Sequence, residues 1–312
     1  MISFFSYILC ALFTWVILGQ IIPILQKDFL AKPNKRSSHL TPIPSGGGIS
    51  FVIVSSLFSL ISGYFLPIYC LPLAIVGFLD DRTKVPASLR YIFQFLTVIF
   101  ILTRSEKINN FISDLNNYES LICYLFLIIF GTAIINFVNF MDGLDGFICL
   151  NIMIVFSFAA FSINSGLFFI LASLCGFIIW NWEPAKVFMG DTGSTYLGAL
   201  LFGIIVNSSN IVNSISVLVV AFPILSDAFI CVIRRFLTGQ NIFRAHKLHL
   251  YQRLNQAGLS HTKVSIMYGF VSLLLGCISL VNISNIYFFL LLVLLIGYIM
   301  DKKFAVPFVK TN

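Results

Sequence analysis

Charged side chains are too scarce in this chain for a protein that folds in water. Asp, Glu, Lys and Arg make up 10% of its 312 residues, whereas about a quarter is usual in soluble domains. Hydrophobic residues make up 59% of the chain. A soluble domain of this length could not cover its surface with so few charges, so we expect a lipid bilayer to surround most of it.

The apolar residues form eleven runs, some of them short for a hydrocarbon core about 30 Å thick. The runs span residues 2–25, 47–64, 65–79, 89–103, 119–138, 146–162, 165–181, 195–207, 211–233, 264–282 and 284–300. The first run precedes the first basic residue, Lys27, which is the reverse of the order in a signal peptide. We therefore predict an all-α, polytopic transmembrane helical bundle of about eleven spans. We expect it to form a single integral membrane domain over residues 1–312.

Basic residues predict the orientation of these spans. If the N-terminus lies outside and every run crosses, the cytoplasmic segments are 26–46, 80–88, 139–145, 182–194, 234–263 and the tail from residue 301. Of the 19 Lys and Arg residues, only Arg104 and Lys107 fall outside these segments and the adjoining helix ends. Because cytoplasmic segments carry an excess of Lys and Arg, the distribution favours an N-terminus outside and a C-terminus in the cytoplasm.

Six aspartates are predicted on the same cytoplasmic face, although the rule for basic residues says little about acids. They are Asp80, Asp81, Asp142, Asp145, Asp191 and Asp227. Ionisable groups at or within a membrane are costly and often mark a functional site. We expect the cytoplasmic loops to form that site together.

Two short motifs place acids beside the ends of apolar runs. Asp80 and Asp81 follow the third run. They could bind Mg²⁺, contact phosphate or take up a proton, or they could only solvate the end of a helix. Residues 188–194 (FMGDTGS) join two runs on the same face. There Asp191 could bind a metal while backbone N–H groups beside Gly190 contact phosphate, or the segment could be a plain turn.

A third motif combines amides and acids at regular spacing, in residues 136–146 (NFVNFMDGLDG). Asn136 and Asn139 are three residues apart and share a helix face, and Asp142 and Asp145 repeat that offset. Capping residues and a turn would need fewer of these side chains. The motif therefore indicates oxygen ligands for a divalent cation.

The loop of residues 234–263 supplies positive and imidazole groups. Arg244, His246 and His249 suit phosphate or pyrophosphate, while zinc would need further ligands and no cysteine cluster is near in the sequence. An interfacial segment against anionic lipid is the alternative. The seven cysteines are scattered without a CxxC pair, which favours packing roles.

These signals share one predicted face, and their combination is more informative than any single one. Cation ligands of the Mg²⁺ type meet a basic loop of the phosphate-binding type, which suggests phosphoryl transfer at the membrane–cytosol boundary. The net charge of +7 is then explained by membrane topology and needs no nucleic acid as partner.

The motifs resemble, in combination and in order, those of the polyprenyl-phosphate N-acetylhexosamine-1-phosphate transferases. The resemblance covers nearly the whole chain and rests on Arg36-Ser37-Ser38-His39, Gly46-Gly47-Gly48, Asp80-Asp81, and residues 139–146, 188–194 and 245–254 (AHKLHLYQRL). The last segment is most similar to the branch that initiates O-antigen. Relatives often carry arginine before the glycines, where this chain has Ser45.

Taken with the motifs, the resemblance implies a role for individual residues. Asp80 and Asp81 match a pair near the lipid phosphate, and Phe188 matches a ring that stacks on uracil. The full set is catalytic Asp80, Asp81, Asp142, Asp145, His246 and His249; substrate-binding Phe188, Asn136, Arg90, Arg244 and Gly190; and metal-binding Asn139 and Asp191.

The resemblance also implies the reaction. An N-acetylhexosamine 1-phosphate passes from a UDP-sugar to undecaprenyl phosphate, UMP leaves, and a lipid-linked surface glycan such as O-antigen begins. Mg²⁺, or Mn²⁺ in its place, is the expected cofactor, and the bacterial inner membrane the expected location. The expected partners are UDP-N-acetylhexosamine, undecaprenyl phosphate and the bilayer, without nucleic acid; a homodimer is compatible with this.

Two other classes of membrane protein share some of these features. A secondary transporter would place its ionisable residues near mid-span and show a repeat between its halves, but here the acids cluster at one end. A membrane prenyltransferase would need further Asp at helical spacing, but Asp80 and Asp81 are followed by Arg82, Thr83 and Lys84. Direct attack and a covalent aspartyl intermediate both remain open as mechanisms.

Overall fold

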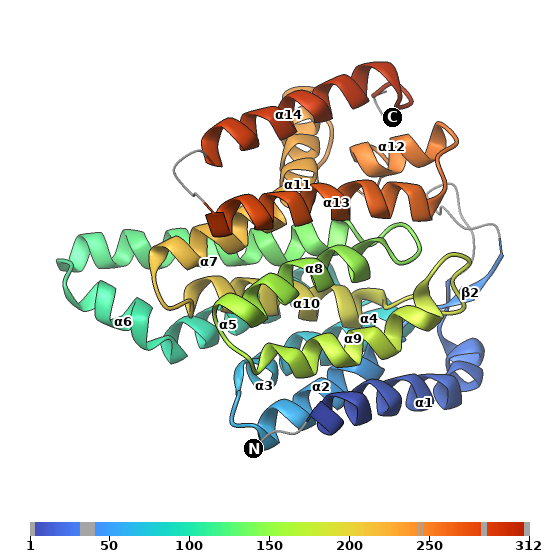
Figure 1. The fold of residues 1–312 in the computed structure, drawn as a ribbon, viewed down its shortest axis with the longest axis horizontal. Helices are drawn as coiled ribbons and strands as arrows, with labels where there is room; N and C mark the ends of the chain where they lie inside the picture. The colour runs from blue at the N-terminus through green and yellow to red at the C-terminus, as the bar shows by residue number, and fades with distance from the viewer. Residues whose placement is uncertain (1–3, 32–40, 243, 245, 282–285, 309–312) are drawn as a thin grey trace.

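The computed structural model describes residues 4–31, 41–242, 244, 246–281 and 286–308, which are almost entirely helical (Figure 1). In chain order the elements are α1 Phe4–Asp28, β1 Leu30–Ala31, β2 Ile43–Pro44, α2 Ile49–Ile61, α3 Leu66–Tyr69, α4 Leu71–Thr83, α5 Ala87–Arg104, α6 Glu106–Ser113, α7 Asn117–Phe140, α8 Phe147–Ser162, α9 Leu167–Asn181, α10 Gly190–Val206, α11 Ile211–Leu237, α12 Leu250–Gln256, α13 His261–Val281 and α14 Ile286–Lys303. The two strands pair antiparallel. The predicted motif at residues 36–39 lies outside the described residues, as does residue 245.

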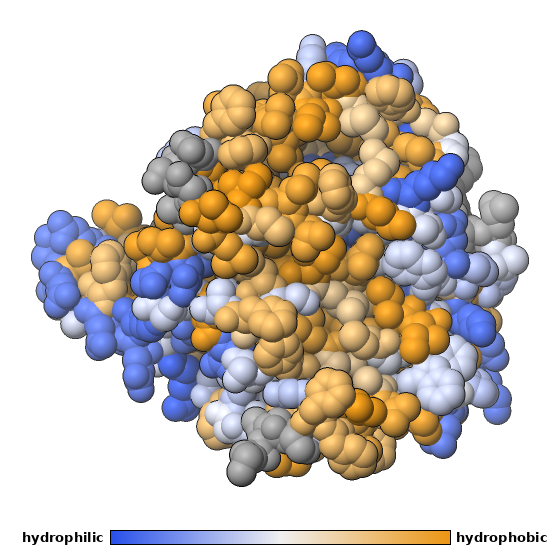
Figure 2. Space-filling view, in the orientation of Figure 1, coloured by the Kyte–Doolittle hydropathy of each residue, from blue (hydrophilic) through white to orange (hydrophobic). Residues whose placement is uncertain are grey.

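Hydrophobic residues form a broad band on the surface between two hydrophilic ends (Figure 2). Among the described helices, α1, α5, α7, α11 and α13 are long and apolar enough to cross a membrane. Helices α2, α8, α9 and α10 are apolar but shorter. A helix satisfies its own backbone hydrogen bonds, so such elements are stable in lipid. The chain is an all-α, multi-pass membrane protein.

Each of the eleven predicted apolar runs contains a helix, but many helix ends differ from the prediction, and three of these differences bear on the site. Helix α4 continues to Thr83 and α10 already begins at Gly190, so Asp80, Asp81 and Asp191 lie in terminal turns of helices and not in loops. Helix α11 likewise continues to Leu237. Polar residues can extend a helix past its apolar run where their side chains find partners at its end.

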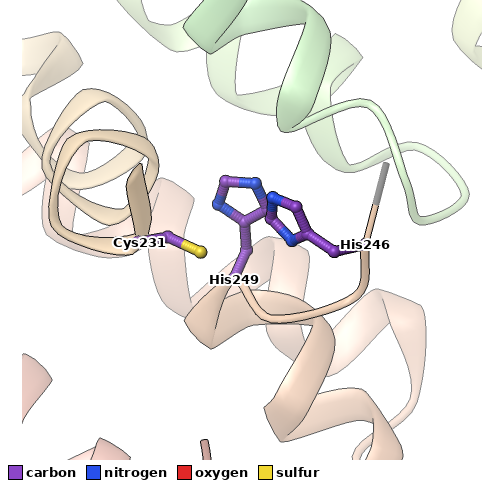
Figure 3. A group of neighbouring side chains, drawn as sticks. All are labelled: Cys231, His246 and His249. Carbon is purple, nitrogen blue, oxygen red and sulfur yellow. The ribbon is translucent and has the colours of Figure 1, made fainter. Parts of the chain in front are cut away.

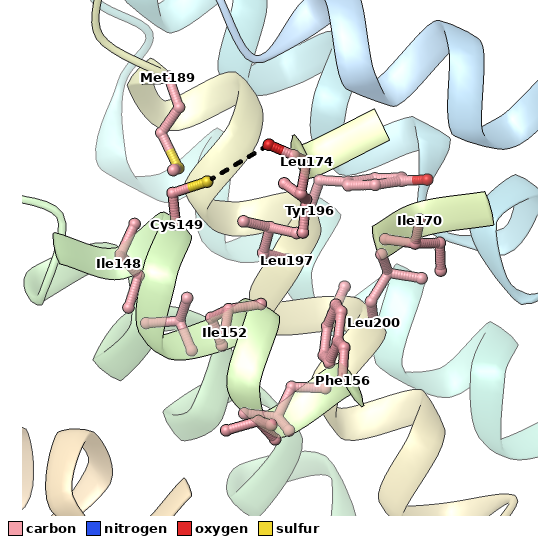
Figure 4. Close-up of a cluster of buried hydrophobic side chains, with 14 of the residues drawn as sticks. Ile148, Cys149, Ile152, Phe156, Ile170, Leu174, Met189, Tyr196, Leu197 and Leu200 are labelled. Carbon is pink, nitrogen blue, oxygen red and sulfur yellow. Dashed lines mark hydrogen bonds between the residues drawn. The ribbon is translucent and has the colours of Figure 1, made fainter. Parts of the chain in front are cut away.

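Helix α10 lies at the centre of the bundle, and every residue from Thr192 to Val206 is buried. Leu197 and Leu200 pack with Ile152 and Phe156 of α8 (Figure 4). A helix that is apolar on all sides is stable only when other helices surround it. The central packing of α10 fixes the position of its first turn, which carries Asp191.

The chain segments that carry the sequence motifs gather at one end of the bundle. Figure 1 shows β2, the connection between α9 and α10, and α12 at this end, with α6 at the opposite end. Each motif enters on a different helix, so the bundle brings together residues that are far apart in sequence.

Candidate active site

Asp81 joins the end of α4 to the start of α10. Its Oδ1 accepts hydrogen bonds from the Ser45 hydroxyl and the Asp191 backbone N–H, both at 3.0 Å. Its Oδ2 accepts from the backbone N–H and the hydroxyl of Thr192, at 3.1 and 2.6 Å. A carboxylate at this place satisfies the free N–H groups and the positive end of the helix dipole. Asp81 therefore fixes the position of Asp191.

The first residue of α10 has to be glycine. Gly190 has a φ of +71°, in the left-handed region that residues with a side chain rarely adopt. A Cβ at this position would also overlap the Asp81 carboxylate. Gly190 was predicted to bind substrate. The structure gives a separate reason for glycine here, because a side chain at this position would overlap Asp81.

Phe188 lies in a loop that is held by the glycine-rich segment before α2. Its N–H donates to the Pro44 carbonyl and its carbonyl accepts from the Gly47 N–H, both at 2.9 Å. The Gly48 N–H donates to the Met189 carbonyl at 3.0 Å. The glycines let the backbone before α2 approach this loop closely, because a Cβ at Gly47 or Gly48 would overlap it. Phe188 itself is half-buried.

A cavity of about 170 Å³ lies between α4, α5, α7 and α10. We call it the acidic-end cavity. Its polar lining residues include Arg90, Gln94, Asn136, Asn139 and Asp191. Both predicted metal ligands are among them, so residues from α7 and α10 meet as the motifs suggested.

The Arg90 guanidinium lies at the edge of this cavity, between the carboxylates of Asp80 and Asp191. Its Nη1 donates to Asp80 Oδ2 at 3.0 Å and to Asp191 Oδ2 at 3.2 Å. Asp80 Oδ1 also accepts from the Val85 N–H at 2.6 Å. A guanidinium offers five donors, and its side chain is 40% exposed here, so Arg90 can also contact an incoming phosphate.

Asn136 is oriented by Gln94, a residue that the sequence analysis missed. The Asn136 amide donates to Gln94 Oε1 and to the Thr132 carbonyl, both at 2.8 Å. Gln94 in turn donates to Asn136 Oδ1 at 3.3 Å. The signal in the sequence was a single amide side chain within the apolar run 89–103. Asn139 lies one turn further along α7 and lines the same cavity.

Asp142 lies in the turn after α7, where the other carboxyl groups of the site repel its negative charge. Burial, followed by repulsion from Asp191, Asp81 and Asp145, raises the pKa of the Asp142 carboxyl well above its usual range. This excess of negative charge favours a bound cation. Carboxylate oxygens and the nearby Asn139 amide are hard ligands of the kind that suits Mg²⁺.

Asp145 connects three segments of the chain. Its Oδ2 accepts from the Ala185 N–H at 3.0 Å, and its own N–H donates to His261 Nδ1 at 3.1 Å. Glu183, in the same loop as Ala185, accepts from the N–H groups of His261 and Thr262 at the start of α13. Asp145 therefore positions loops. His261 was missed because nothing in the sequence pairs it with a residue 116 positions away.

His246 and His249 stack on each other with ring centroids 4.9 Å apart, and Cys231 of α11 lies beside them (Figure 3). Burial is the main reason that the pKa of each histidine falls to about 3, so both imidazoles are neutral. One ligand atom from each of the three side chains lies within 4.8 Å of the others, a set that a zinc ion could use with a further ligand. The sequence had shown no cysteine near these histidines; the fold brings one from α11.

Asp227 holds the start of α12. It accepts hydrogen bonds from the N–H groups of Leu250 and Tyr251, at 2.8 and 3.0 Å, and from the Tyr268 hydroxyl at 2.8 Å. The Tyr251 hydroxyl donates to the Phe140 carbonyl at 3.0 Å. The histidine loop is thereby fixed to the end of α7, next to the acidic turn.

The structure gathers some of the predicted site residues and separates others. Arg90, Asn136, Asn139 and Asp191 line the acidic-end cavity, and Asp80 joins them through Arg90. The remaining predicted residues do not line it: Asp81, Asp142, Asp145, Phe188, Gly190, Arg244, His246 and His249. Arg244 is exposed, whereas His249 is only 2% exposed.

Comparison with known proteins matches residues 64–209 to the model of glycosyl transferase family 4. The chain resembles this family over that segment, which is a little under half of its length. The matched segment contains every predicted site residue except Arg244, His246 and His249.

Two individual relatives are similar to the chain along most of its length, and a third over a shorter segment. It is 27% identical over 266 residues to the probable undecaprenyl-phosphate N-acetylglucosaminyl 1-phosphate transferase of Bacillus subtilis, covering 77% of this chain and 74% of that one. It is 28% identical over 317 residues to the phospho-N-acetylmuramoyl-pentapeptide-transferase of Staphylococcus saprophyticus, covering 88% and 97%. A decaprenyl-phosphate N-acetylglucosaminephosphotransferase of Mycobacterium leprae matches at 29% over 135 residues, 38% and 33% of the two chains.

Proposed function

We propose that the protein transfers an N-acetylhexosamine 1-phosphate from a UDP-sugar to undecaprenyl phosphate and releases UMP. The observation that carries this proposal is the acidic-end cavity, where Arg90 lies between carboxylates of two helices beside an amide pair. The names of the relatives support both the lipid phosphate and the sugar phosphate as substrates. The product would begin a lipid-linked surface glycan such as O-antigen.

We further propose that eleven helices cross the bacterial inner membrane, with the N-terminus outside and the acidic-end cavity facing the cytoplasm. The helices are α1, α2, α4, α5, α7, α8, α9, α10, α11, α13 and α14. The distribution of basic residues supports this orientation, because all but Arg104 and Lys107 then lie at the cytoplasmic side.

Asn139 and Asp191 would hold Mg²⁺, or Mn²⁺ in its place. The excess negative charge around Asp142 and the hard oxygen ligands in the cavity support a divalent cation. Such an ion, when bound, neutralises charge on the pyrophosphate and on the departing UMP.

The protein's own residues would mainly position the two substrates. An oxygen of the lipid phosphate attacks the phosphorus that carries the sugar, the bond to the UMP oxygen breaks, and a diphosphate-linked sugar remains on the lipid. A phosphate monoester has a second pKa of about 6 and is largely ionised at neutral pH, so the attack needs no strong base. Arg90 would orient the lipid phosphate and Asp80 would orient Arg90.

The positions of the carboxylates disfavour a secondary transporter. Asp80, Asp81 and Asp191 lie at helix ends on one side of the bundle. Transporters commonly bind their substrate and coupling ions near the middle of the membrane. A substrate site at the membrane–cytosol boundary agrees better with a soluble nucleotide sugar meeting a lipid phosphate.

Release of UMP is the direct test. Purified protein with Mg²⁺, undecaprenyl phosphate and a panel of UDP-N-acetylhexosamines should release UMP with at least one sugar. Asp191→Asn should lower the rate by about 100-fold or more, because a charge at the reacting phosphates is lost. Asp114→Asn, an exposed residue after α6, is the matched control and should leave the rate unchanged. Absence of UMP with every sugar would refute the proposed reaction.

A further inference from the structure

A second cavity, of about 550 Å³, lies between α11, α12, α13 and α14. We call it the α14 cavity. It shares no lining residue with the acidic-end cavity. Its volume lies within the range of about 300–1,000 Å³ that is usual for ligand pockets.

Most of the wall of the α14 cavity is apolar and opens at the hydrophobic surface. Met267 and Val271 of α13 line one side, and Leu294 and Ile296 of α14 line another. Leu294 and Ile296 are also 38% and 45% exposed, and Ile286 is the only buried residue of α14. An apolar cavity of this kind does not retain water. In a bilayer, the hydrocarbon beside it is acyl chain.

One end of the α14 cavity is polar and carries excess positive charge. Asp301 accepts hydrogen bonds from Arg234 Nη1, at 3.1 Å to each oxygen, and from Arg253 Nη2. Lys302 lines the same end. Over the whole cavity, Arg234, Arg253 and Lys302 outnumber the two lining aspartates, Asp227 and Asp301. The Phe308 ring, 4.1 Å from the Arg234 guanidinium, covers one side of this cluster.

We propose that the α14 cavity binds an anionic glycerophospholipid. An acyl chain lies between α11, α13 and α14, and the phosphate lies beside Arg234 and Lys302. Arg253 already donates to the carbonyls of Leu248 and Val306, so Arg234 and Lys302 are the groups that face the headgroup. Anionic lipids of the cytoplasmic leaflet are attracted by lysines and arginines at the ends of membrane helices.

Bound lipid would also stabilise α12. Leu250 and Leu254 of this short helix line the α14 cavity, and so does Asp227, which holds the first turn of α12. An acyl chain against these residues replaces an open apolar surface with close contact. Since a ligand that binds only the folded protein raises its stability, the melting temperature should rise with anionic lipid. The inference is independent of the transfer reaction.

The test is lipid retention by the full chain, measured by native mass spectrometry. Protein in detergent is mixed with phosphatidylglycerol or with phosphatidylcholine, and melting is followed in parallel. We expect phosphatidylglycerol to be retained preferentially and to raise the melting temperature more. Equal retention of the two lipids would overturn the assignment of the charged end.

Two pairs of variants separate the apolar and charged parts of the site. Gly297→Phe places a ring in the α14 cavity, since no atom lies within 4 Å of a Cβ built there, and should abolish retention. Leu295→Phe, on an exposed face of α14, should retain lipid normally. Lys302→Gln should weaken phosphatidylglycerol binding about fivefold, whereas Lys303→Gln, which does not line the cavity, should not.

The outcome of a competition experiment decides the class of lipid. Undecaprenyl phosphate added to the phosphatidylglycerol complex should leave the bound lipid in place. Displacement of the bound phosphatidylglycerol by undecaprenyl phosphate would mean that the carrier lipid is the occupant and would overturn the proposal. Retention of phosphatidylglycerol by Gly297→Phe, with melting behaviour like that of the unmodified protein, would also overturn it, because the lipid would then bind elsewhere.

Discussion

Asp80 and Asp81 are neighbours in the chain but have different surroundings. Asp81 accepts four hydrogen bonds, three of them from the first turn of α10. Asp80 instead pairs with Arg90 at the edge of the acidic-end cavity. Adjacent carboxylates can therefore serve separate purposes: Asp81 maintains the contact between two helices, and Asp80 orients a group that can reach phosphate.

Replacing Asp81 should mainly reduce stability. The Asp81 carboxylate accepts hydrogen bonds from N–H and hydroxyl groups of α10. In Asp81→Asn, an NH₂ group replaces one of the accepting oxygens, so at least one buried donor loses its acceptor. Each such loss costs about 1–3 kcal/mol. The free energy of unfolding in detergent should fall by about that amount. Asp80→Asn is the comparison: its UMP release should fall while its stability changes less. Unchanged stability of Asp81→Asn would contradict the role assigned to Asp81.

Gly190 and Gly63 form a natural pair for testing steric contact at the site. Both have positive φ, +71° and +78°, but a Cβ at Gly63 meets no atom within 4 Å. Alanine at either position should cost about 1–2 kcal/mol in backbone strain. Gly190→Ala should cost more in thermal stability, and also lose activity, because its Cβ would displace Asp81. Equal effects of the two substitutions would show that the contact with Asp81 is unimportant.

At the scale of helices, the sequence predicted which segments are helical better than it predicted where the helices end or which residues contact one another. Apolar runs located the helices because lipid requires long apolar segments with internal hydrogen bonds. The spacing of Asn136 and Asn139 likewise predicted their common face. The partners of Asp81 could not be foreseen, since Ser45 and Thr192 are 36 and 111 residues away. Cys231 reaches the histidines only through the packing of α11 against the following loop.

The histidine loop before α12 should make stability depend on pH. The pKa of buried His249 is about 3, whereas that of an unfolded histidine is about 6.5. Below about pH 6.5 the unfolded chain therefore binds a proton that the folded chain does not, and the free energy of unfolding falls as pH falls. For this residue the loss from about pH 7 to about pH 5.5 is about 1 kcal/mol.

The variant His249→Gln isolates this contribution. Its free energy of unfolding in detergent should depend less on pH by about 1 kcal/mol over the same interval, because the titrating group is gone. Lys263→Gln, which removes an exposed charge near the start of α13, serves as control and should keep the full pH dependence. A pH dependence in His249→Gln equal to that of the unmodified chain would show that this imidazole is not the group that titrates.

The molecule as a whole has a hydrophobic band between two hydrophilic ends (Figure 2). The sequence motifs and the acidic-end cavity lie at the end with β2 and α12, and α6 lies at the other. A lipid phosphate stays at the boundary of the bilayer, and a nucleotide sugar stays in water. A site at a helix end lets both reach the same carboxylates without either crossing the membrane.

The proposed orientation can be tested with single cysteines on the two sides. Asp114→Cys, after α6, should react with a membrane-impermeant maleimide in intact cells from which any outer barrier has been removed. Lys186→Cys, between α9 and α10, should react only after the membrane is opened. Both native residues are exposed, so reactivity depends on the side they face. The unmodified chain is the control, because its exposed Cys175 and Cys277 lie on apolar helices where lipid should shield them. Labelling of Lys186→Cys in intact cells would reverse the orientation and move the acidic-end cavity to the outer face.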